Sequence, residues 1–309
     1  KGFAKANKKK GNHIITTKIE HKAILESCKS LEDEGFEITY VNVDKYGMVN
    51  LLELEQAMKE STILISVMFA NNEIGTIQPI KEIAKIAKEK NVIFHTDCVQ
   101  AVGDIKINVE DIGIDLLSMS GHKFYGPKGV GALYVRSGIE FEKIQDGGHQ
   151  ERDKRAGTEN VPGIVGMGTA LELANKNLEK NNRHIKFLRD YFVTEIKEKI
   201  PYIRINGDME KRMPGNANIS FEGIEGEALL LNLDMKGICA SSGSACTTGS
   251  LEPSHVLRAM GLPYTAAHGT IRFSLSRYNT PEEIERVIEV LPPIIERLRS
   301  ISPYWNEKE

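Results

Sequence analysis

Short apolar runs alternate with amphipathic stretches over the first 135 residues. Two of these runs, 62–70 (TILISVMFA) and 92–99, are almost wholly apolar, which is typical of strands covered on both faces. Between them, 80–90 has apolar residues at helical spacing. The alternation predicts an α/β fold, a mostly parallel sheet covered by helices. The predicted strands are 13–17, 36–43, 62–70, 92–99, 115–120 and 131–135.

The pattern changes in the second half of the chain. A glycine-rich, charged stretch precedes 161–200, which we predict to be a helix that crosses between two lobes. We therefore expect a large domain over 1–175 and a smaller C-terminal α+β domain over 176–309. Strands are predicted at 216–221, 238–241 and 270–275, and helices at 225–233, 252–260 and 281–302. The pair Pro292 and Pro293 should break or bend the last helix.

Polar side chains follow three of the predicted strands. Ligands of parallel sheets bind beyond the carboxyl ends of the strands. We therefore expect these side chains to line one crevice. They are Asn71, Asn72 and Glu73 after the third strand, Asp97 and Gln100 at the end of the fourth, and Ser120, His122 and Lys123 after the fifth.

Two charged residues interrupt apolar strands. Asp97 lies within 92–99, and burying an isolated carboxylate costs several kcal/mol. A protonated ligand nitrogen would compensate it. Arg272 lies within 270–275 and calls for an anion, for which a substrate carboxylate and an internal salt bridge are equally suitable.

Lys123 lies in a glycine-rich loop, 118–131, between two apolar flanks that we predict to be buried strands. Burial would lower the pKa of this lysine and favour the neutral amine that forms imines. A glycine turn with a solvated lysine explains the run as well. A nucleotide-binding P-loop does not, because Pro127 follows the second glycine and no Ser or Thr follows Lys128.

The four cysteines form neither a disulfide framework nor a zinc-binding pattern. We expect Cys28, Cys98 and Cys239 to be buried packing residues. Cys246 is different, because it lies among Ser, Thr and Gly in 241–250, where a thiol is accessible and can act as a nucleophile.

The composition excludes several classes of protein. The net charge of −3 gives no general attraction to nucleic acid or membranes, and no apolar run could span a bilayer. The chain opens with no signal-peptide pattern. We expect a cytoplasmic protein without a metal site.

Several motifs, taken together, resemble those of the NifS/IscS-like cysteine desulfurases. They occur in the family's order over nearly all 309 residues. The motifs are Glu20-His21-Lys22-Ala23, Ala70 to Gly75, His95-Thr96-Asp97 with Gln100, Ser120 to Gly129, Arg155 with Gly157-Thr158, Ser242 to Cys246, and Ile271 to Leu275. The resemblance implies a homodimeric enzyme of fold type I, the aspartate-aminotransferase fold, with pyridoxal 5'-phosphate (PLP) as its cofactor.

The same resemblance implies the reaction and the residue roles. L-Cysteine would become L-alanine, and a Cys246 persulfide would pass its sulfur to an acceptor such as an Fe–S scaffold or a tRNA-thiolation protein. Lys123 would hold PLP and move the substrate proton, and Asp97 would pair with the ring nitrogen. The other implied contacts are His21 on the ring face, Gln100 and Asn72 near the ring oxygen, Ser120 and His122 at the phosphate, Thr158 at the phosphate of the partner subunit, and Arg272 with Asn72 at the substrate carboxylate.

One feature of the family is absent from this sequence. Members carry an earlier segment with a Gly-Ala-Thr-Glu-Ser-like phosphate loop that opens a helix. We expect that this segment was cleaved, is disordered or was left out of the sequence. Two alternatives stay open: a selenocysteine lyase or other PLP-dependent β-elimination enzyme, in which Cys246 is dispensable, and a non-catalytic scaffold with a relic site.

Overall fold

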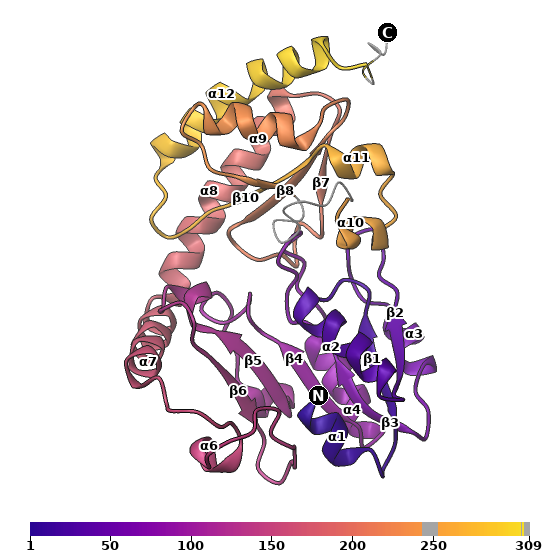
Figure 1. The fold of residues 1–309 in the computed structure, drawn as a ribbon. Coiled ribbons are helices and arrows are strands. Elements are labelled where there is room, and N and C mark those ends of the chain that lie inside the picture. Colours follow the sequence, from indigo (N-terminus) through magenta and orange to yellow (C-terminus); the bar gives the residue numbers. More distant parts are fainter. Residues whose placement is uncertain (243–252, 304, 306–309) are drawn as a thin grey trace. The chain divides into compact units, whose positions relative to one another are not determined.

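A computed structural model describes residues 1–242, 253–303 and 305 (Figure 1). The chain divides into two compact units. Unit 1 comprises Lys1–Val43, Met48–Asn71 and Gln78–Leu178, and unit 2 comprises Asp44–Gly47, Asn72–Ile77 and Glu179–Glu309. The sequence pattern did not indicate that two short segments of the first half pack within unit 2. In the part of the chain that is described, no helix is long and apolar enough to cross a membrane.

Unit 1 is organised around a six-stranded sheet with the order β2-β1-β3-β4-β5-β6 (Figure 1). Its strands are β1 (His13–Thr17), β2 (Glu37–Val41), β3 (Thr62–Ser66), β4 (Ile93–Asp97), β5 (Leu116–Ser120) and β6 (Gly131–Val135). The first five are parallel, and β6 pairs antiparallel with β5. This confirms the predicted mostly parallel sheet. The prediction that 131–135 is buried is wrong, because β6 is an edge strand and residues 131–133 are exposed.

The helices of unit 1 are mostly short. They are α1 (Gly2–Asn7), α2 (Lys22–Asp33), α3 (Leu51–Gln56), α4 (Ile80–Glu89), α5 (Val109–Ile112), the 3-10 helix η1 (Gly121–Phe124), α6 (Gln150–Asp153) and α7 (Val161–Lys176). Helix α2 packs on β2 and α4 on β4. The predicted single helix over 161–200 is two helices: α7 ends at Lys176 with Asn177 as its C-cap, and α8 (Leu178–Lys199) follows.

Unit 2 contains a four-stranded antiparallel sheet in the order β7-β8-β10-β9. Its strands are β7 (Ile203–Asn206), β8 (Asn216–Phe221), β9 (Ser241–Ser242) and β10 (Thr270–Ser274). Besides most of α8, its helices are α9 (Gly226–Asp234), α10 (His255–Ala259), α11 (Tyr264–His268) and α12 (Pro281–Ser300). Sequence reasoning missed β7 and α11 and placed β9 too early.

The core of unit 2 explains why α12 is not broken. The helix continues through Pro292 and Pro293, contrary to prediction. The neighbouring Leu291 and Ile295 are almost fully buried in one apolar cluster with residues of α8, α9 and the sheet. Packing of this face stabilises the helix despite the missing backbone donors.

Candidate active site

The predicted cofactor residues of unit 1 follow strands that run in the same direction. Asp97 is the last residue of β4, Ser120 is the last of β5, and η1 with Lys123 comes directly after it. His21 follows β1 and caps the N-terminus of α2, where its Nδ1 accepts a hydrogen bond from the Ala23 N–H at 3.1 Å. Because β1, β4 and β5 are parallel, all of these residues lie at the carboxyl edge of one sheet.

Asp97 is buried, with only 8% of its surface exposed. Burial raises the pKa of this carboxyl, while a hydrogen bond from the Val99 N–H at 2.9 Å and electrostatic interactions with His21 and Lys123 lower it in part. The carboxyl therefore lies within electrostatic range of both side chains. Since desolvation dominates, a cationic ligand group beside it would stabilise the charged form.

Lys123 lies in a tightly turned loop. The Gly121 N–H donates to the Val130 carbonyl at 2.9 Å, and the Gly126 N–H donates to the Gly121 carbonyl at 2.9 Å. A Cβ atom at Gly126 would lie 2.8 Å from that same oxygen, so the turn requires glycine. The lysine itself is exposed, which corrects the expectation of a buried amine: the β6 flank is an exposed edge and does not cover the loop.

The remaining cofactor residues of unit 1 offer donors and acceptors suited to a polar aromatic ligand. Ser120 Oγ and His122 Nδ1 lie 3.0 Å apart. Gln100 is half-buried, and its Oε1 has no hydrogen-bond partner among the described residues. Thr158 is exposed on the segment just before α7. A buried acceptor without a donor and a desolvated carboxyl both fit PLP, which has a ring hydroxyl and a ring nitrogen that can be protonated.

Glu20 is a second buried carboxyl near the site, and sequence reasoning gave it no role. One oxygen accepts hydrogen bonds from Thr17 Oγ1 at 2.7 Å and from the Met68 N–H at 2.9 Å. Burial raises its pKa to about 8, and the charge of Asp97 adds to this shift. The carboxyl joins the ends of β1 and β3 directly before His21. The sequence signal that could have identified Glu20 is its position as a carboxylate shortly after the predicted strand 13–17.

The predicted substrate residues meet within unit 2. Arg272, in β10, donates from Nη1 to the carbonyl oxygen of Asn72 at 2.8 Å. Its Nε is buried and has no hydrogen-bond partner among the residues that the structure describes. The observed contact is to a carbonyl rather than to a carboxylate, so the guanidinium keeps a donor for an anion.

The cysteines differ in exposure. Burial raises the pKa of Cys28 to about 11 and raises that of Cys98 further, in keeping with packing residues. Cys239 is exposed, so its predicted burial is wrong. It lies just before the two-residue edge strand β9, which leaves it uncovered. Cys246, the predicted nucleophile, lies outside the described residues.

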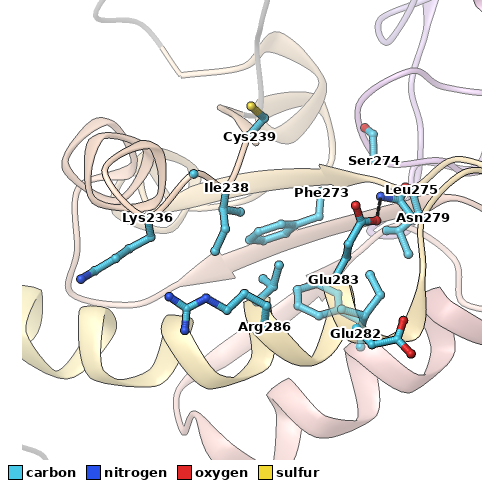
Figure 2. A pocket seen from close by; sticks show the side chains of 14 residues that line it. Lys236, Ile238, Cys239, Phe273, Ser274, Leu275, Asn279, Glu282, Glu283 and Arg286 are labelled. Carbon is cyan, nitrogen blue, oxygen red and sulfur yellow. Dashed lines mark hydrogen bonds between the residues drawn. The ribbon is translucent and has the colours of Figure 1, made fainter.

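Unit 2 also contains a cavity of about 610 Å³ beside β10 and α12 (Figure 2). Figure 2 shows Lys236 and Arg286 on one side of it, and Glu282 and Glu283 on the other. Cys239 is among the fourteen lining residues shown, whereas no predicted cofactor or substrate residue is. The cofactor and substrate residues that the structure describes therefore do not line this cavity.

Comparisons with known proteins agree on one family. Residues 1–287 match the family model Aminotransferase class-V. The chain is 57% identical over 309 residues to the cysteine desulfurase IscS of Clostridium botulinum, covering 99% of this chain and 78% of that protein. It is also 57% identical over 303 residues to the cysteine desulfurase IscS of Methanosarcina thermophila, covering 98% of this chain and 75% of that protein.

Solved structures show the same likeness. A NifS-like protein superposes with a TM-score of 0.89 at 40% identity, covering 96% of this chain and 78% of that chain. A NifS-like protein from Rickettsia africae superposes with a TM-score of 0.84 at 33% identity, covering 96% and 80%.

Proposed function

The chain belongs to the class-V aminotransferase family and is a PLP-dependent cysteine desulfurase. We propose that Asp97, Lys123, Arg272 and Cys246 carry its reaction. Its substrate is L-cysteine, and its product sulfur passes to an acceptor. The similarity to cysteine desulfurases over nearly the whole chain supports the activity. For the site, the main observation is Asp97, buried at the end of β4 within electrostatic range of Lys123.

The residues of unit 1 would hold the cofactor. PLP, when bound, supplies a ring that withdraws electrons from the bonds at the substrate Cα. Asp97 would offer a carboxylate to the ring nitrogen, and the partnerless Oε1 of Gln100 would accept from the cofactor. Lys123 would hold the cofactor through its amine and, once released, move the proton at the substrate Cα. The remaining contacts proposed are His21 at the ring face, and Ser120 with His122 at the phosphate.

Arg272 and Asn72 would bind the amino-acid substrate. The free donor face of Arg272 suits a carboxylate, and its Nη1 contact to the Asn72 carbonyl fixes the guanidinium plane. A guanidinium held in this way loses little conformational entropy when two of its N–H groups donate to a carboxylate. The Asn72 side chain would complete the site.

Cys246 would take the sulfur. Its thiolate attacks the substrate sulfur, so that an S–S bond forms while the substrate Cβ–S bond breaks. The electron pair of the broken bond goes to the substrate Cβ, which takes up a proton, and the carbon product leaves as L-alanine. The substrate sulfur becomes the outer sulfur atom of a Cys246 persulfide, and no external oxidant or reductant is needed.

We propose that the enzyme is a homodimer. Helix α7 is apolar around much of its surface, with Val161 and Val165 exposed by 59% and 62%. The edge strand β6 exposes Leu133 in the same unit. A second copy is the proposed occupant because Thr158, three residues before α7, is exposed and would contribute to the phosphate site of the partner subunit.

The destination of the sulfur and the compartment are also proposals. An acceptor protein for Fe–S clusters or thionucleosides suits a protein-bound persulfide. The thiolate chemistry needs a reducing compartment, and we propose the cytoplasm. Measuring L-alanine and persulfide in wild type and in Cys246→Ala tests the assignment. Loss of persulfide in the variant is expected, whereas undiminished persulfide would indicate a selenocysteine-lyase-like or other β-elimination enzyme. A chain that never takes up PLP would indicate a scaffold.

A further inference from the structure

Glu73 holds together several parts of unit 2. Its backbone carbonyl accepts hydrogen bonds from Asn216 Nδ2 at 2.9 Å and from Asn218 Nδ2 at 3.0 Å. Its carboxyl oxygen Oε2 accepts a hydrogen bond from Ser254 Oγ. The residue is buried, with 4% of its surface exposed, and it directly follows Asn72. Glu73 therefore connects the segment 72–77, which contains the proposed substrate contact Asn72, to strand β8 and to the start of α10.

Ser254 is the other half of this connection. Its hydroxyl donates to Glu73 and accepts from the N–H groups of Val256 at 3.1 Å and Leu257 at 3.3 Å, so it also caps α10. All hydrogen-bonding capacity of the hydroxyl is used, and the side chain is buried. The orientation of the serine is thus fixed from both sides. In sequence, Ser254 lies eight residues after Cys246.

The segment that carries Glu73 is itself rigidly placed. The Met213 N–H donates to the Gly75 carbonyl at 2.9 Å, and the Ile77 N–H donates to the Lys211 carbonyl at 2.8 Å. Gly75 has a positive φ of 76°, and a Cβ atom there would lie 2.7 Å from the Asn216 side chain. The backbone of 72–77 is therefore fixed independently of the Glu73 side chain.

We propose that Glu73 is a positioning residue for sulfur transfer, acting through Ser254, which follows Cys246 by eight residues in the sequence. The inference rests on the proposed role of Cys246. The carboxyl anchors Ser254, the second residue described after the Cys246 segment, to the segment that contains the proposed substrate contact Asn72. Because the backbone of 72–77 has its own hydrogen bonds, removing the carboxyl should leave Asn72 and Arg272 in place and affect the transfer step alone.

The test separates the transfer step from the cofactor chemistry. Persulfide formation on Cys246 is measured in a single turnover with L-cysteine. Exchange of the Cα hydrogen of L-alanine with solvent deuterium is measured in parallel, because it needs Lys123 and the cofactor but no thiol. Glu73→Ala and Ser254→Ala should each slow persulfide formation at least about 10-fold, the scale of one buried hydrogen bond. Exchange and the KM for L-cysteine should change less than about 2-fold.

Two further variants control for stability and for the hydrogen bond itself. Glu73→Gln keeps an acceptor oxygen and should restore most of the rate. Thr280→Ala removes the side-chain cap of α12 in the same unit and should lower the stability of that unit, but it should leave persulfide formation unchanged. The double variant of Glu73 and Ser254 should be no slower than the slower single variant.

The outcomes that overturn the inference are distinct. Equal slowing of exchange and persulfide formation would make Glu73 a purely structural residue, and no slowing of either would leave the contact without a role. Either result, with a wild type that forms the persulfide, overturns this inference alone. A wild type that forms no Cys246 persulfide overturns the proposed function as well.

Discussion

Arg272 and Asn72 are 200 positions apart in sequence, yet the Arg272 Nη1 lies 2.8 Å from the Asn72 carbonyl oxygen. The contact joins the two residues that the sequence indicated for the substrate carboxylate. It also leaves the buried Nε of Arg272 without a partner among the described residues. The guanidinium is oriented by the hydrogen bond from Nη1, and its Nε–H can still donate to an anion.

Arg272→Lys should therefore raise the KM for L-cysteine by about 10-fold or more, because a lysine cannot offer two parallel donors. Cofactor binding, measured by visible absorbance, should not change. Arg299→Lys is the matched control, since Arg299 also donates to backbone carbonyls of unit 2, those of Glu222 and Tyr202. An unchanged KM in Arg272→Lys would exclude Arg272 from carboxylate binding.

Asp97→Asn should lower turnover roughly 100-fold, the scale of one preorganised electrostatic contact. The amide keeps the shape of the side chain but cannot stabilise a protonated ring nitrogen. Steady-state L-alanine production measures the effect. Asp104→Asn is the control, because Asp104 is another aspartate of unit 1 whose pKa burial raises, to about 6. Comparable turnover in wild type and Asp97→Asn would remove Asp97 from the proposed mechanism.

Val165→Glu should convert the dimer into monomers and reduce activity, since it places a charge on the exposed apolar surface of α7. Sedimentation velocity measures the change. Phe187→Glu is the matched control, because Phe187 is an equally exposed apolar residue, by 63%, on α8. A wild type that sediments as a monomer, or a Val165→Glu variant that still dimerises, would contradict the proposed interface.

His95 should make the native state sensitive to acid. Its ring bridges Ser66 Oγ at 2.8 Å and Ser118 Oγ at 2.9 Å, and burial lowers its pKa to about 4. Between that value and the ordinary histidine pKa of 6.5, His95 is protonated in the unfolded state but neutral in the native state. The contribution of His95 to the free energy of unfolding therefore falls as pH falls. From pH 7 to pH 5 the loss is about 2 kcal/mol.

Glu20 acts in the opposite direction, because its raised pKa makes the native state bind the extra proton. The measurement is therefore the difference in unfolding free energy between wild type and His95→Gln, by denaturant titration at both pH values. This difference should shrink by about 2 kcal/mol on acidification. A difference that stays constant with pH would show that His95 does not titrate in this way.

Local patterns predicted much of this fold and some of its chemistry. The buried run that ends at Asp97 and the apolar strand around Arg272 identified both residues, because a charge inside an apolar strand requires a partner. The same reasoning failed for Lys123 and Cys239, since their exposure depends on edge strands that cover less than the sequence suggested. The contact between Glu73 and Ser254 joins residues 181 positions apart, and no local pattern reports such a pairing.

The central claim is that Lys123 and Cys246 act in succession on one molecule of L-cysteine. Mass spectrometry of the cysteine-containing peptides after a single turnover tests it most directly. The account predicts one added sulfur atom on the Cys246 peptide, an equal amount of L-alanine, and neither product from Lys123→Ala. Free sulfide with an unmodified Cys246, or sulfur found on Cys239 at an undiminished rate in Cys246→Ala, would contradict it.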